Sequence, residues 1–153
     1  MAGLPGIPVA LARPNLNITL LEATSKKTEF LRAAVVHLEL ASCHVKHARA
    51  EEYGQGEGRG RYDIVISRAV AELRLLVELG VPLLRQGGQL LAMKGPLAEQ
   101  ELQGARGAIS AVGGWAEDGV EGEGVNSLVK IIKEGETPPN FPRPWGQIKH
   151  RPL

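Results

Sequence analysis

The residues whose type and position could do chemistry stand directly after short apolar runs. Glu22 closes the run 17–22 and lies nineteen residues after Gly3, the first residue of Gly3-Leu4-Pro5-Gly6. In nucleotide-binding sheets, an acid about 20 residues beyond a glycine turn accepts hydrogen bonds from the ribose hydroxyls. The alternative is that this carboxylate stabilises the N-terminus of the helix that follows. Glu22 is therefore a candidate ribose ligand with a structural alternative.

Basic residues occupy similar positions. Lys26 and Lys27 fall in the first turn of an expected helix, where cations oppose the helix dipole, so they are either solvated charges or contacts to a nucleic-acid phosphate. Arg68 follows the run 62–67, and Lys94 closes the run 89–93. Surface salt bridges are the alternative for the arginine, but polar residues at several strand ends would face one ligand edge of a parallel sheet.

The C-terminal residues 141–151 combine cations with aromatic side chains. Arg143, Lys149 and Arg151 are interleaved with Phe141 and Trp145, and no acid follows Glu136. That mixture suits phosphate contact and base stacking. A disordered terminus is the alternative that composition leaves open.

The sequence offers little support for a metal site or for a catalytic nucleophile. On a strand, Cys43 and His47 would share a face while His44 points away, and no second cluster completes a metal site. The sequence contains neither a Gly-x-Ser-x-Gly turn nor a Gly-x-x-x-x-Gly-Lys-Ser/Thr phosphate loop. We expect no metal and no covalent nucleophile.

The order of apolar runs predicts the elements that position these residues. We expect parallel strands near 17–22, 43–47, 62–67 and 89–93, helices between them, and an antiparallel hairpin near 115–133. The expected helices comprise a stripe formed by Phe30, Leu31, Ala34, Val35 and Leu38, a segment 73–79, and a stripe over 98–112. Gly87-Gly88 is expected to turn the chain into the fourth strand. This alternation predicts an open, Rossmann-like α/β sheet over residues 1–136, followed by a Pro-rich basic tail, 137–153, without regular structure.

Composition limits the classes of protein. The 153 residues are 43% hydrophobic and 23% charged with a net charge of +1, so neither a disordered chain nor a globally cationic nucleic-acid binder is indicated. The longest apolar stretches fall far short of the ~20 residues of a membrane helix, and no secretory signal is readable. One cysteine cannot form an internal disulfide, which fits a reducing compartment. We expect a cytoplasmic protein, or an organellar one if the source is a eukaryote, with no membrane partner.

Five blocks, in order and at matching spacing, resemble one family. They are 4–10 (LPGIPVA), 21–31 (LEATSKK running into FL), 49–52 (RAEE), 66–71 (ISRAVA) and 93–95 (MKG), and the C-terminal residues 137–153 resemble the family's closing pattern as well. Over nearly its whole length, the chain resembles the bacterial small-subunit ribosomal RNA methyltransferases of the family called glucose-inhibited division protein B. The resemblance implies transfer of a methyl group from S-adenosylmethionine to N7 of a guanine in 16S ribosomal RNA.

The resemblance also implies site residues. Gly3 and Leu4 correspond to the end of the cofactor loop, Glu22, Ala23 and Thr24 to the ribose-binding strand end, Ala50 and Glu51 to the adenine side, and Arg68 to the cofactor-site arginine. Lys26, Lys27, Lys94, Arg143, Lys149 and Arg151 are expected on the RNA side.

The front of the chain departs from the family pattern. Family members carry N-terminal helices, a first strand and an Asp-x-Gly-x-Gly loop before the block at Leu4, whereas Met1-Ala2-Gly3 begins inside that loop. We therefore expect an N-terminally truncated sheet, poor cofactor binding and no RNA methylation by this chain alone. The alternatives are a non-catalytic RNA-binding or regulatory fragment and, less favoured, a nicotinamide-dependent oxidoreductase, whose three-glycine loop and proton donor are not found.

Overall fold

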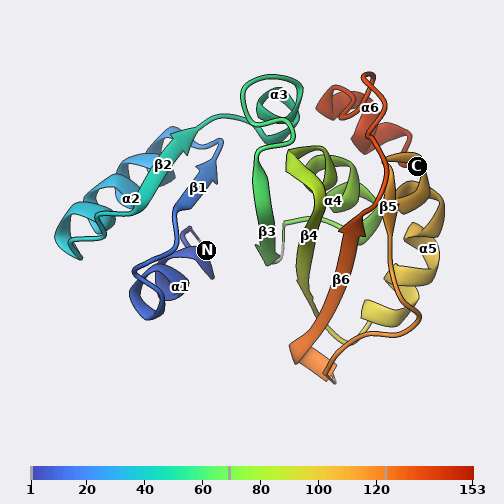
Figure 1. Cartoon of the computed structure of the whole chain (residues 1–153), viewed down its shortest axis with the longest axis horizontal. Coiled ribbons are helices and arrows are strands. Elements are labelled where there is room, and N and C mark those ends of the chain that lie inside the picture. Colours follow the sequence, from blue (N-terminus) through green and yellow to red (C-terminus); the bar gives the residue numbers. More distant parts are fainter. Residues whose placement is uncertain (1, 69, 123) are drawn as a thin grey trace. The chain divides into compact units, whose positions relative to one another are not determined.

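The computed structural model describes residues 2–68, 70–122 and 124–153, with only the backbone of Val125, and divides the chain into two compact units, Met1–Ala50 and Glu51–Leu153. The four expected strands alternate with helices as predicted, and two further helices, over Gly6–Ala12 and Ala50–Gln55, were not predicted (Figure 1). Each unit has its own apolar core.

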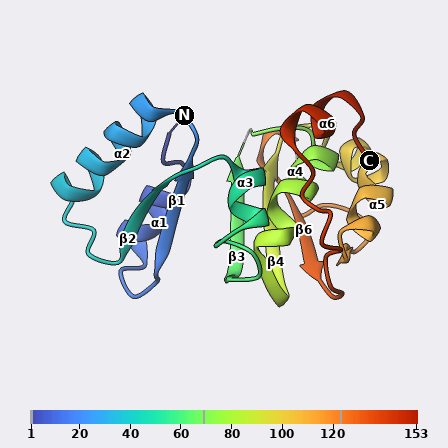
Figure 2. The same ribbon diagram turned by 90° about the horizontal axis from the view of Figure 1, so that it is seen from above.

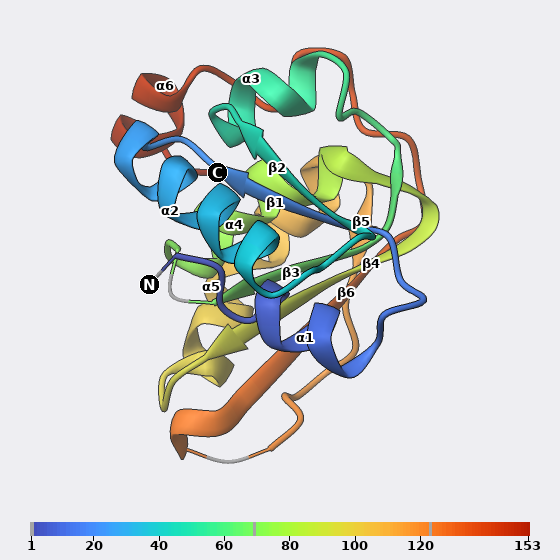
Figure 3. The ribbon, with the colours of Figure 1, turned by 90° about the vertical axis from the view of Figure 1, so that its left-hand side faces the viewer.

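The first unit is a parallel pair of strands with two helices packed on it. Strand β1 (Ile18–Glu22) pairs with β2 (Cys43–His47), and helices α1 (Gly6–Ala12) and α2 (Ser25–His37) contribute to the core around them (Figure 3). A Cβ atom at Gly6 would lie 2.3 Å from Leu20 Cδ2. Glycine at this position therefore lets α1 approach β1 closely.

One sequence prediction for α2 is wrong in detail. The stripe was expected to bury both Phe30 and Leu31, but Leu31 is 2% exposed and Phe30 is 59% exposed. Adjacent helical residues point about 100° apart, so both cannot face a narrow two-stranded sheet. Thr24 is at the N-cap position of this helix, and its side chain makes no capping hydrogen bond.

The second unit is a four-stranded sheet in the order β3-β4-β6-β5. Strand β3 (Tyr62–Arg68) runs parallel to β4 (Leu84–Lys94), and β6 (Ser127–Lys133) runs antiparallel to β4 (Figure 2). Helices α4 (Leu73–Gly80) and α5 (Ala98–Ala111) bury one face of the sheet, where Leu90 and Ile131 are 0% exposed. These helices confirm the two helical segments expected there.

The fourth strand is longer than its apolar run predicted. Gly87 and Gly88 do not turn the chain into the strand but lie inside β4, at a register shift between Tyr62 and Ile64 of β3. A Cβ atom at Gly88 would lie 2.9 Å from the carbonyl oxygens of Arg85 and Asp63. The two glycines therefore mark a bulge, a role that glycine often has within strands.

The predicted hairpin near 115–133 is confirmed only in part. Strand β5 (Gly114–Trp115) pairs with the end of β6, and a single bridge joins Glu121 to Leu128. Between them the Arg106 guanidinium of α5 donates hydrogen bonds to the carbonyls of Ala116 at 2.7 Å and Glu117 at 3.2 Å. Those carbonyls are therefore used by a helix side chain instead of the neighbouring strand.

The tail expected to lack regular structure contains a helix. Helix α6 (Trp145–His150) follows Pro144, and Ile148 within it is fully buried. The short helices α3 (Ala50–Gln55), η1 (Val81–Leu83) and η2 (Gly124–Asn126) complete the elements. Among the described residues, no helix has the length and apolar character needed to span a bilayer.

A tyrosine pair joins α3 to the start of β3 and makes a pH prediction. The hydroxyls of Tyr53 and Tyr62 lie 2.6 Å apart, and burial, followed by this hydrogen bond, raises the pKa of Tyr53 from 10.0 to about 12. The unfolded chain thus loses this proton first as the pH rises, so the stabilisation is complete below pH 10 and is lost toward pH 12.

We expect the free energy of unfolding of the wild type to fall by about 1 kcal/mol more than that of Tyr53→Phe between about pH 8 and pH 11. Urea unfolding at these two pH values measures the difference. Parallel pH profiles for the two proteins would contradict the assignment.

Candidate functional site

Glu22 is the last residue of β1, and one oxygen of its carboxylate accepts a hydrogen bond from the nearby backbone. Its Oε1 accepts a hydrogen bond from the backbone N–H of Thr24 at 2.9 Å, and its backbone oxygen accepts one from Ala48 N–H at 3.1 Å. Among the described residues, Oε2 has no hydrogen-bond partner. This carboxylate is therefore held at the end of the strand with an acceptor oxygen still available, as a ribose ligand requires.

The residues after Glu22 are also held in place. His47 Nε2 lies 3.1 Å from the carbonyl oxygen of Ala23, and the hydroxyl of Thr28 donates to the carbonyl of Thr24 at 3.1 Å. Lys26 and Lys27 follow in the first turn of α2 with exposed side chains. Hydrogen bonds thus hold the polar groups at the ends of β1 and β2 in place, and the exposed side chains of Lys26 and Lys27 follow in the next turn of the chain.

Gly3, in the block Gly3-Leu4-Pro5-Gly6, is required by its backbone conformation and by close packing. Gly3 has φ +80°, and a Cβ atom there would lie 2.6 Å from Ile7 Cδ1 and 2.9 Å from Leu31 Cδ2. The left-handed backbone and the packing both require glycine, independent of any ligand. Leu4 follows with 36% of its surface exposed.

Arg68 and Lys94 end the neighbouring strands of the second unit. Arg68, opposite Met93 in the register, is exposed. The side chain of Lys94 is only 7% exposed and forms an ion pair with Glu101, 2.8 Å from Nζ to Oε2. Ala69, part of the matching block, lies outside the described residues. The structure thus leaves the arginine accessible and pairs the lysine internally.

Glu51 and Arg143 line one cavity of about 370 Å³, formed by α3 and the C-terminal segment. Gln55, Asn140 and Trp145 also line it. Glu51 is 8% exposed, whereas Ala50 before it is half-buried. Residues predicted for the adenine side and for the RNA side thus meet at this cavity.

Arg143 is engaged by a buried acid. Its backbone N–H and Nε donate to Glu78 Oε1 at 2.9 Å and 2.7 Å, and its Nη2 donates to Oε2 at 2.7 Å. Hydrogen bonding to Glu78 raises the pKa of the guanidinium. Lys149 and Arg151 are exposed in and just after α6, so they are the freer cations of this segment.

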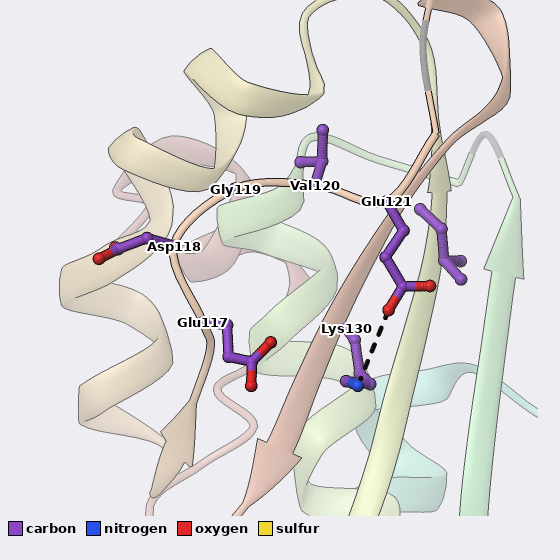
Figure 4. Close-up of a pocket in the computed structure, with 7 residues that line it drawn as sticks. Glu117, Asp118, Gly119, Val120, Glu121 and Lys130 are labelled. Atoms are coloured by element: carbon purple, nitrogen blue, oxygen red, sulfur yellow. Dashed lines mark ion pairs between the residues drawn. The ribbon is translucent and has the colours of Figure 1, made fainter.

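A second, smaller hollow of about 120 Å³ lies beside the β5–β6 connection (Figure 4). Glu117, Asp118 and Glu121 line it, and Lys130 pairs with Glu121 at 3.8 Å. Three acids against one cation make it unsuited to an anionic ligand. No group of three or more potential metal ligands occurs among residues 2–68, 70–122 and 124–153.

Sequence reasoning missed three buried or half-buried charges: Glu78, Glu101 and Arg59. Glu78 lies within the apolar stripe of α4, and an acid at such a position signals a buried partner. No local pattern distinguishes Glu101 or Arg59 from ordinary surface residues, because Glu101 pairs with a lysine on a strand and with the backbone 28 residues earlier, and most partners of Arg59 lie about 80 residues later.

Solved structures identify the class of fold. A predicted O-methyltransferase from Agrobacterium tumefaciens superposes with a TM-score of 0.67 at 23% identity, covering 88% of this chain and 71% of that one. The Thermus thermophilus 16S rRNA N2 G1207 methyltransferase, in complex with AdoMet and guanosine, gives 0.60 at 20% identity, covering 89% of this chain and 33% of that one. The fold is therefore that of the Rossmann-like methyltransferases, which confirms the predicted fold class.

Sequence comparison identifies the family. The profile of rRNA small subunit methyltransferase G matches residues 2–121. Ribosomal RNA small subunit methyltransferase G of Chloroflexus aggregans is 45% identical over 99% of this chain, and that of Deinococcus radiodurans is 42% identical. The chain belongs to the rRNA small subunit methyltransferase G family. It spans 66% of the length of the first relative and 62% of the second.

Proposed function

We propose that this chain is the catalytic part of an enzyme that transfers a methyl group from S-adenosylmethionine to N7 of a guanine in small-subunit ribosomal RNA. The observation that supports it most is the family match over residues 2–121, with 45% identity to a relative of that name. The match favours methyl transfer over the oxidoreductase alternative. The location proposed is the cytoplasm, where bacterial ribosomal RNA is found.

The available polar groups fit the proposed cofactor. Glu22 has a free acceptor oxygen for ribose hydroxyls, and Ala23 and Thr24 hold its strand end. Ala50 and Glu51 are proposed for the adenine side, with Arg68 and the block Gly3-Leu4 completing the cofactor contacts. S-adenosylmethionine supplies a methyl group already activated by its sulfonium.

The proposed reaction asks the protein to position groups rather than move protons. Guanine N7 has a lone pair and no hydrogen, so its methylation requires no general base. The side chains of this chain would hold N7, the methyl carbon and the sulfur in line, an effect that can supply several kcal/mol. The RNA side is proposed to include Lys26, Lys27, Lys149 and Arg151, whose exposed cations suit phosphates.

The decisive experiment measures transfer of labelled methyl to small ribosomal subunits that lack the modification. It uses the full chain and a fusion that adds the uncovered part of the Chloroflexus aggregans relative. We expect 7-methylguanosine among the nucleosides of 16S RNA digested after incubation with the fusion, and little or none after incubation with the full chain alone. Binding to RNA without transfer by either protein would favour the non-catalytic alternative and refute the enzymatic proposal.

Glu22→Ala should weaken S-adenosylmethionine binding by about 2 kcal/mol, the magnitude of hydrogen bonds to a charged group. Calorimetric titration of whichever protein transfers methyl gives the affinity. Glu29→Ala is the matched control, because Glu29 is an exposed acid on α2 of the same unit. Equal affinities for the wild type and Glu22→Ala would remove Glu22 from the cofactor site.

A further inference from the structure

A largely buried ion pair connects the end of β4 to the beginning of α5. Lys94 Nζ lies 2.8 Å from Glu101 Oε2, and the two side chains are 7% and 26% exposed. A lysine this buried requires a partner, because an unpaired ammonium in the interior loses its hydration without compensation. Glu101 therefore keeps Lys94 charged and directed inward.

The same pair holds the backbone of the segment that follows β3. Lys94 Nζ donates to the carbonyl oxygen of Ala71 at 2.5 Å, and the backbone N–H of Leu73 donates to Glu101 Oε2 at 2.7 Å. Glu72, at the N-cap of α4, provides no side-chain cap. Glu101 thus supplies, from another helix, the acceptor that a capping residue normally provides.

Ala71 and Leu73 follow Arg68 by three and five residues, and the side chain of Arg68 is exposed at the end of β3. We propose that Glu101 is a positioning residue for the cofactor site: with Lys94 it holds the backbone at Ala71 and Leu73 and so limits where Arg68 can be presented. The proposal rests on the proposed function for the ligand involved. It assigns Lys94 to the same task instead of direct RNA contact.

The test compares three variants, made in both the full chain and the fusion described above: Glu101→Gln, the double variant Lys94→Met/Glu101→Leu, and the control Glu99→Gln in the exposed first turn of α5. Amide exchange at Leu73, the thermal midpoint and the dissociation constant for S-adenosylmethionine are measured for each. Glu101→Gln should bind S-adenosylmethionine about tenfold more weakly, the size of one lost hydrogen bond from a charged group such as Arg68. Leu73 should also exchange faster in this variant, whereas Glu99→Gln should match the wild type.

The double variant separates positioning from general stability. It leaves no unpaired buried charge, so its thermal midpoint should return toward the wild-type value. It restores partners to neither Ala71 O nor Leu73 N–H, so its affinity and its exchange at Leu73 should remain impaired.

Two results would overturn the proposal. The first is a double variant in which both the affinity for S-adenosylmethionine and the thermal midpoint return to the wild-type values. The second is a Glu101→Gln variant that binds S-adenosylmethionine as tightly as the wild type. If neither the chain nor the fusion binds S-adenosylmethionine or transfers methyl, the proposed function is contradicted. In that case amide exchange still tests whether Glu101 holds the backbone N–H of Leu73. Faster exchange at Leu73 in Glu101→Gln would support this contact, and unchanged exchange would contradict it.

Discussion

Glu78→Gln is expected to destabilise the second unit by about 3–5 kcal/mol, because it leaves the largely buried Arg143 guanidinium without its counter-charge. Glu78 is 0% exposed and accepts three hydrogen bonds from Arg143, one of them from the backbone. The glutamine side chain can accept at one atom only and places N–H groups against another donor. The C-terminal segment and α4 should therefore separate in this variant.

Urea unfolding followed by circular dichroism measures the effect. Glu72→Gln is the matched control. Glu72 directly precedes α4 but pairs with Arg74 at the surface, where the side chains of Glu72 and Arg74 are 62% and 43% exposed. That control should change stability by less than about 1 kcal/mol. The double variant Glu78→Leu/Arg143→Met should recover much of the loss. Equal stability of Glu78→Gln and wild type would show that the pair does not hold the segment.

Arg59→Met should cost about 3 kcal/mol, because it leaves several partly buried carbonyls without a donor. The Arg59 guanidinium donates to the carbonyl oxygens of Phe141 at 2.6 Å, Thr137 at 2.7 Å, Pro138 at 3.1 Å and Gly54 at 3.4 Å. Residues 137–142 contain three prolines and form few backbone hydrogen bonds of their own. Their position therefore depends on this side chain and on Gln55, which donates to Pro139 and Pro142.

Arg61→Met is the control for Arg59. Arg61 is exposed, and it donates one long hydrogen bond, 3.3 Å, to the carbonyl of Glu57. Limited proteolysis should cut Arg59→Met within the segment 134–144 at protease concentrations that leave the wild type and Arg61→Met intact. Identical cleavage rates in all three proteins would contradict the role assigned to Arg59.

The sequence alone determined the elements whose cause is local. The runs at 17–22, 62–67 and 89–93 became parallel strands because short runs rich in β-branched and aliphatic residues favour a sheet, and the expected strand at 43–47 formed as well, with Val45 as its one branched residue. The helices over 73–79 and 98–112 followed from apolar residues at helical spacing. Five sequence blocks also sufficed to identify the family, which the profile match confirms.

Only the tertiary structure decided how the polar groups are used. Lys94 and Arg143 looked like accessible cations, but they pair with acids 7 and 65 residues away in sequence, respectively. The Pro-rich tail looked unstructured, because the donors that satisfy its carbonyls come from Arg59 and Gln55, about 80 residues earlier. Local periodicity reflects which face of an element is apolar, whereas an ion pair or a cross-chain hydrogen bond depends on a distance that exists only after folding. Glu22 illustrates the division: its place at a strand end was readable from the sequence, but the oxygen left available to a ligand was visible only in the structure.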